Sequence, residues 1–175
     1  MQTWTARLRL GLVAALLPAP AVAAEPDLVA RLTAAVDGAP PCYARSYGTL
    51  HLDAHPRQMV ESVAVTARSA APSAEQGRHE LLFAVKFKQQ PRWYRKAGLC
   101  VAEAGQLACR LEGDAGSAVI ATLGQKGLRV DTGPKGIGVD GPDGSLVGVG
   151  GEVSDDRVFF LHASPRSVCL AASGE

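Results

Sequence analysis

Short apolar runs separated by glycine-rich turns constrain the fold of this chain more than any other feature. Residues 59–66 and 81–88 alternate apolar and polar side chains, with Met59, Val63 and Phe83 on the apolar faces, as half-buried strands do. Further strands are predicted around residues 92–102, 107–112, 118–123, 128–131, 137–139, 146–149 and 158–162. Because the intervals between them are too short for parallel crossovers, we expect a mainly all-β domain, an antiparallel β-barrel or β-sandwich meander.

The first 24 residues are typical of a secretory signal. Arg7 and Arg9 precede an apolar run at 10–17, and small residues follow up to Ala24. The run is far shorter than the roughly 20 residues that span a bilayer, so we expect it to be removed on export to the periplasm or the exterior. No later stretch is predicted to span a membrane.

Three regions follow from this pattern: a signal peptide at 1–24, an N-terminal helix and linker at 25–41, and an antiparallel β domain at 42–175. The helix is predicted over 25–36, because Leu28 and Leu32 recur at helical spacing after Pro26. The segment at 68–77 is predicted to be a loop. The whole chain carries a formal net charge of +1, which favours neither nucleic acid nor a membrane as partner.

All four cysteines follow the predicted signal, and an oxidising compartment favours disulfides over free thiols. A tight turn at Ala104 and Gly105 would place Cys100 directly opposite Cys109, in a non-hydrogen-bonded pair close enough for a bridge. Cys42 and Cys169 would then join the two ends of the domain. Both disulfides are predicted to be structural, since the chain has no C-x-x-C motif.

Positive charge and aromatic side chains gather on one predicted hairpin, whose turn is expected at 89–91. Like charges aligned across a hairpin repel unless an anion meets them. The hairpin is therefore a candidate site for an anionic partner, although lysines along a strand also serve against edge-to-edge aggregation. Its residues are Lys86, Lys88, Arg92, Trp93, Tyr94, Arg95 and Lys96.

His51 and His55 are the candidate metal ligands, because a short helical turn would place them four residues apart on one face. Thr49 as cap and Pro56 as stop favour that turn. Asp53, or a histidine elsewhere in the chain, would have to supply a third ligand. Local packing of surface histidines is the alternative interpretation.

Other site classes are poorly supported. The stretch 136–141 matches G-x-G-x-x-G, but turn residues follow it where a nucleotide site needs a helix. The acidic residues at 140–156 lack the spacing of a calcium loop. We find no catalytic constellation and expect no cofactor.

The stretch from Cys42 to Tyr47, the sequence HLDAHPRQMV, and DDRVFFL before Cys169 resemble a family of small exported alphaproteobacterial proteins. That family has no assigned activity, so the resemblance implies no functional residues. The sequence as a whole predicts a non-catalytic binding or inhibitor-like module of the cell envelope that recognises an anionic component or an acidic protein surface. A barrel carrying a small apolar ligand and a small hydrolase with an unrecognised site are the alternatives.

Overall fold

A computed structural model describes residues 28–35, 38–68 and 77–174. The predicted signal, both ends of the predicted helix at 25–36 and most of the predicted loop at 68–77 lie outside the described residues. The elements are α1 Leu28–Thr33, β1 Cys42–Ser46, α2 Thr49–Ala54, β2 Val60–Ala67, β3 Arg78–Phe87, β4 Trp93–Glu103, β5 Gln106–Leu111, the 3-10 turn η1 Glu112–Asp114, β6 Ser117–Leu123, β7 Gly127–Asp131, β8 Ile137–Asp140, β9 Leu146–Val149, β10 Val158–Ser164 and α3 Arg166–Ser173.

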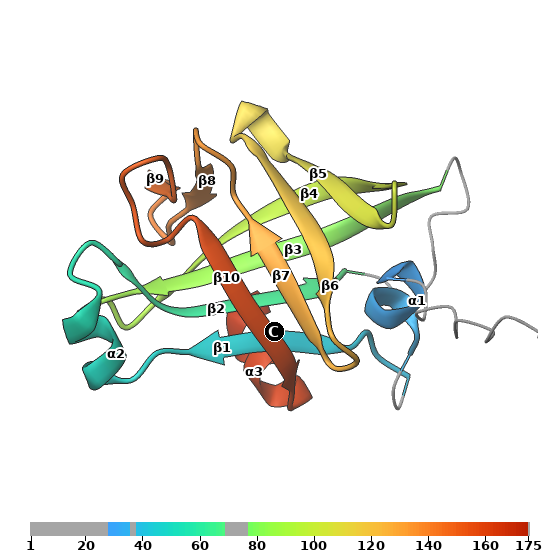
Figure 1. The fold of residues 1–175 in the computed structure, drawn as a ribbon, viewed down its shortest axis with the longest axis horizontal. Coiled ribbons are helices and arrows are strands. Elements are labelled where there is room, and N and C mark those ends of the chain that lie inside the picture. The colour runs from blue at the N-terminus through green and yellow to red at the C-terminus, as the bar shows by residue number, and fades with distance from the viewer. Residues whose placement is uncertain (1–27, 36–37, 69–76, 175) are drawn as a thin grey trace, which may run out of the picture.

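Eight of the described strands close into an antiparallel barrel (Figure 1). Their order is β3-β2-β1-β10-β7-β6-β5-β4, and the pairing of β3 with β4 closes the ring. This decides between the two predicted architectures in favour of the barrel. The β8–β9 hairpin branches from β4 through one backbone pair, Arg95 with Asp140.

Large apolar side chains fill the inside of the barrel. The predicted alternation of β3 is confirmed, since Leu81, Phe83 and Val85 are buried in the core. The start of β2 differs from the prediction. A register shift between Val60 and Ser62 turns Val60 inward, at 0% exposure, and leaves Met59 53% exposed. A β-bulge of this kind inserts a residue and reverses the faces before it.

Two short helices lie at opposite ends of the barrel (Figure 1). Leu28 and Leu32 of α1 are buried in the same core as the strands, so α1 closes its end. The α2 helix at the other end confirms the predicted helical turn. Its N-cap is Gly48, however, and no side chain caps it. The prediction of Thr49 as cap is therefore wrong, because Thr49 is already the first helical residue.

Both predicted disulfides are confirmed. In the β4–β5 hairpin, Cys100 lies opposite Cys109, with Cα atoms 4.0 Å apart. The turn is formed by Ala104 and Gly105, which both have positive φ, as the tightest hairpin turns require. The second disulfide joins Cys42 at the start of β1 to Cys169 in α3, 127 residues later.

The predictions did not include β1 or the C-terminal helix α3. The α3 helix packs on the outside of the wall formed by β1 to β4. Beneath it lie small residues whose side chains point away from the core, Ala44, Ala64 and Ala84. Alanine side chains are small enough to let α3 approach the sheet closely. The helix therefore buries this outer face of the barrel wall. The 136–141 stretch lies in and beside β8, and a hairpin follows it, as its turn residues indicate.

Candidate functional site

The predicted basic hairpin is the β3–β4 hairpin, and its register separates the positive charges. Lys86 lies opposite Trp93, Arg95 lies opposite Ala84, and Lys96 lies opposite a phenylalanine. No basic residue of β3 directly faces a basic residue of β4. The predicted repulsion between aligned charges is therefore wrong, because the turn pairs each cation with an apolar neighbour.

Several side chains of the hairpin are held by contacts within the chain. The Nζ of Lys88 donates a hydrogen bond to the Leu52 carbonyl at 3.4 Å. Tyr94 is buried, donates its hydroxyl hydrogen to Gln90 Oε1 at 2.8 Å, and meets the Phe87 ring edge-on. These contacts join the hairpin to α2 and fill the core, so neither side chain is presented to a partner.

Lys86 and Trp93 lie opposite each other on the outer face that also carries Arg95, whereas Tyr94 and Lys96 lie on the other face of β4. Lys86 lies 3.9 Å from a carboxylate oxygen of Glu61 on the neighbouring strand. Trp93 packs against the alanine-rich cluster beneath α3, and Arg92 is exposed. The predicted set therefore does not form one continuous surface.

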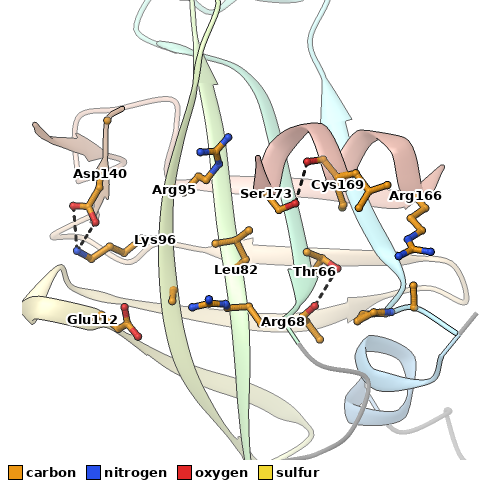
Figure 2. A pocket seen from close by; sticks show the side chains of 16 residues that line it. Thr66, Arg68, Leu82, Arg95, Lys96, Glu112, Asp140, Arg166, Cys169 and Ser173 are labelled. Atoms are coloured by element: carbon orange, nitrogen blue, oxygen red, sulfur yellow. Dashed lines mark hydrogen bonds and ion pairs between the residues drawn. The ribbon is translucent and has the colours of Figure 1, made fainter. Parts of the chain in front are cut away.

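Arg95 and Lys96 line a pocket on the outer wall of the barrel (Figure 2). The pocket has a volume of about 520 Å³ and lies between α3 and the outer face of β2, β3 and β4. Four of its lining side chains are cationic: Arg68, Arg95, Lys96 and Arg166. Two are carboxylates: Glu112 and Asp140.

The four cations differ in their partners. Lys96 is only 12% exposed, and its Nζ donates to both oxygens of Asp140, at 2.9 and 3.1 Å. Arg68 pairs at 2.8 Å with a glutamate of β3. Within the described residues, Arg95 and Arg166 have no carboxylate partner. Positive charge therefore remains in the pocket after its internal ion pairs are formed.

Helix α3 fixes one wall of the pocket and orients Arg95. The Cys42–Cys169 disulfide ties the helix to β1. At the other end of the helix, the Nε of Arg95 donates to the carbonyl of Ala172. A cation at a helix C-terminus interacts favourably with the free carbonyls and the helix dipole. The guanidinium is thus held in one orientation, and its Nη atoms make no hydrogen bond within the described residues.

The floor of the pocket is apolar. Leu82 and Ala97 lie opposite each other on β3 and β4, and their side chains point outward with Arg95. Leu170 of α3 completes this surface. Figure 2 shows Leu82 between Arg95 and Arg68, with Glu112 and Asp140 beyond Lys96. The pocket therefore combines guanidinium groups, an apolar floor and an acidic edge.

Of the predicted histidine pair, His51 lies on α2 and His55 is the C-cap of that helix, and neither lines the pocket. The rings of His51 and His55 stack with centroids 4.4 Å apart, and Tyr47 stacks on His51 at 4.7 Å. The Nε2 of His51 is 3.0 Å from Gln58 Oε1. Among the residues that the structure describes, no group of three or more metal-type ligands forms. No described residue supplies the third ligand that the prediction requires.

Asp156 and Asp143, two acidic residues of the late loops, accept hydrogen bonds within the chain. The buried carboxylate of Asp156 accepts the backbone N–H groups of Met59, at 2.7 Å, and Val60, at 3.1 Å. Burial raises the pKa of Asp156, and these N–H bonds only partly offset that effect. Asp143 accepts hydrogen bonds from the hydroxyl and the N–H of Ser145, which lower its pKa. Asp156 therefore joins its loop to the start of β2, and Asp143 positions its own turn.

The inside of the barrel does not favour the carrier alternative. Phe159, Leu161 and Ile120 are among its large side chains with less than 2% exposure. The protein's own side chains therefore occupy the interior of the barrel, as in other small barrels. The hydrolase alternative stays a prediction, since the pocket is lined by two carboxylates, Glu112 and Asp140.

Two of the pocket's cations were missed by the sequence analysis. Arg68 lies at the end of β2, where the sequence predicts the beginning of a loop. Arg166 is the first residue of α3. This helix has only eight residues, so its sequence pattern is too short to predict it. Only the long-range pairing of Cys42 with Cys169 indicated that this segment returns to the start of the domain.

Comparison with known proteins adds no relative: no protein-family model, curated protein or solved structure matches the chain. The family resemblance therefore stays a prediction. None of the helices in the described part of the chain is long and apolar enough to cross a membrane. The two disulfides indicate an oxidising compartment outside the cytoplasm.

Proposed function

We propose that this protein is a non-catalytic binding or inhibitor-like module of the cell envelope, periplasmic or secreted, that recognises an anionic partner. Arg95 carries the proposal. It belongs to the predicted basic hairpin, lines the pocket, and has Nη donors without a carboxylate partner among the described residues. Arg166 adds a second such guanidinium. Guanidinium groups of this kind match carboxylates and phosphates in geometry and charge.

The proposed site is centred on Arg95, in the middle of the β3–β4 hairpin, and no longer on the residues near its turn. Lys88 and Tyr94 are engaged in contacts that hold the fold. Arg95 points outward into a concavity whose lining cations outnumber its carboxylates, whereas Lys96 lies on the opposite face of β4 and is paired with Asp140. A concave site with excess positive charge concentrates anions more effectively than scattered lysines on a convex wall.

A charge-matched comparison tests the proposal. We expect the oxidised protein to be retained on phosphocellulose and the variant Arg95→Gln/Arg166→Gln to elute at clearly lower salt. The control is Arg110→Gln/Lys126→Gln, which removes two charges from exposed positions that do not line the pocket. The control should elute close to the wild-type protein. Equal elution of the two double variants would contradict the proposal, because retention would then reflect total charge alone.

A further inference from the structure

We infer that the pocket beside α3 binds a small organic anion with an apolar chain, its phosphate or carboxylate on Arg95 and its chain on Leu82. This inference rests on the proposed function and specifies its ligand. It replaces an acidic protein surface with a small molecule as the partner.

The shape of the site favours a small molecule. A pocket of about 520 Å³ is within the range of typical small-molecule sites, roughly 300 to 1,000 Å³. The guanidinium of Arg95 packs against Gly174, the residue that ends α3. The contact is close: a Cβ atom added at Gly174 would lie 2.9 Å from Nη2 of Arg95. The anion-binding group is therefore recessed beside a helix, where a small anion reaches it more easily than a flat acidic surface does.

The orientation of Arg95 is set before any ligand arrives. Its Nε is occupied by the Ala172 carbonyl, so the guanidinium plane is fixed while the Nη atoms keep their donors. A pre-oriented guanidinium loses little side-chain freedom on binding and suits two parallel hydrogen bonds to an oxyanion. Arg95 would be the anchor, with Arg68 and Arg166 adding charge nearby.

The rest of the pocket specifies the remainder of the ligand. Leu82, Ala97 and Leu170 form an apolar floor that inorganic phosphate would leave uncovered. At the far edge, the carboxylate of Glu112 disfavours a second anionic group, while that of Asp140 is paired with Lys96. These features together fit one oxyanion joined to a short hydrocarbon chain.

Calorimetric titration with four probes tests the inference: inorganic phosphate, hexyl phosphate, hexanoate and hexylammonium. We expect hexyl phosphate to bind more tightly than phosphate, with a gain of up to about fourfold for each methylene buried. Hexylammonium should not bind. The relative affinities of hexyl phosphate and hexanoate identify which oxyanion the pocket prefers.

Two variants assign the two halves of the ligand. Arg95→Gln should lower the affinity for hexyl phosphate by about tenfold or more, as expected for the loss of a charged hydrogen-bonding group. Leu82→Ala should lower the affinity for hexyl phosphate to nearly that for inorganic phosphate. The affinity for inorganic phosphate itself should be unchanged. Arg110→Gln serves as the control and should match the wild-type protein. Unchanged thermal unfolding of each variant shows that the fold is intact.

The outcomes separate the inference from the proposed function. Equal, Arg95-dependent affinities for phosphate and hexyl phosphate would overturn the inference and leave the proposed function standing. The same holds if an acidic peptide such as oligoglutamate binds through Arg95 while hexyl phosphate and hexanoate do not. If no anion binds and the phosphocellulose comparison shows no dependence on the pocket, both are wrong.

Discussion

The two sides of the wall formed by β2 to β4 are built in different ways. The inner side consists of large residues such as Phe83 and contains the Cys100–Cys109 disulfide in its core. The outer side consists of alanines covered by α3 and contains the Cys42–Cys169 disulfide. The inner side is local in sequence, with its cysteines 9 positions apart, whereas the outer side joins cysteines 127 positions apart.

This difference separates stability from the candidate site. The inner side closes the barrel without help from α3, since its core strands bury one another. The outer side supplies the pocket, because α3 forms one wall and orients Arg95. Changes on the inner side should therefore affect unfolding alone, and changes on the outer side should also affect binding.

The largest effect is expected from removing the outer disulfide by Cys42→Ala/Cys169→Ala. In the chain-entropy model, a loop of 127 residues corresponds to about 5 kcal/mol of unfolding free energy. Release of α3 should also abolish anion binding, because the wall beside Arg95 is lost. Denaturant unfolding and calorimetric titration of the same samples measure the two effects. Unchanged binding in a folded variant would show that α3 stays in place without its tether.

Phe83→Ala and Leu82→Ala compare neighbouring residues on opposite sides of β3. Phe83 lies in the core, so its truncation should lower the unfolding free energy by about 3 to 5 kcal/mol. Leu82 is only partly buried, and its truncation should cost about 1 kcal/mol or less. Urea unfolding measures both. Similar losses for the two variants would mean that the pocket floor belongs to the core.

The inner disulfide should matter less for stability than the outer one and not at all for binding. Cys100→Ala/Cys109→Ala opens a loop of 9 residues, for which the same entropy model gives about 3 kcal/mol. The β4–β5 hairpin keeps its Ala104–Gly105 turn and its backbone pairing. Binding of an anion by this variant should equal that of the wild-type protein at a temperature where both are folded. A loss of binding would show that the two sides of the wall are coupled.

The same contrast explains which parts of the structure the sequence could predict. The inner side follows from local patterns, since the alternation at 81–87 and the turn at Ala104 and Gly105 need only neighbouring residues. The prediction failed at Met59, where a bulge reverses the faces and no local pattern marks the extra residue.

The outer side depends on contacts that are distant in sequence. Arg95 was predicted as a binding residue from local charge, but its contact with the Ala172 carbonyl needs a helix that arrives 77 residues later. Arg68 and Arg166 carry no local signal, because only closure of the barrel and the tether of α3 bring them to one pocket. The disulfide pairing was the one long-range contact available from the sequence.

The smallest effect concerns pH and contrasts buried with exposed carboxylates. Burial raises the pKa of Asp156, which is 2% exposed, above its value in the unfolded chain. The stability associated with this group is therefore complete below the ordinary carboxyl pKa and is lost as pH rises through the raised pKa. Each unit of difference corresponds to about 1.4 kcal/mol. Above about pH 4, the ordinary carboxyl pKa, we expect the wild-type unfolding free energy to fall with rising pH through this group.

Asp156→Asn tests the assignment, because its amide oxygen can still accept the N–H of Met59 but does not titrate. The difference in unfolding free energy between this variant and the wild type should change with pH over that interval. Asp143→Asn is the matched control. Asp143 lies on an exposed turn and its pKa is lowered, so the difference for this variant should stay constant above about pH 5. If the Asp156→Asn difference also stays constant, burial does not raise the pKa of this carboxylate, and the assignment is wrong.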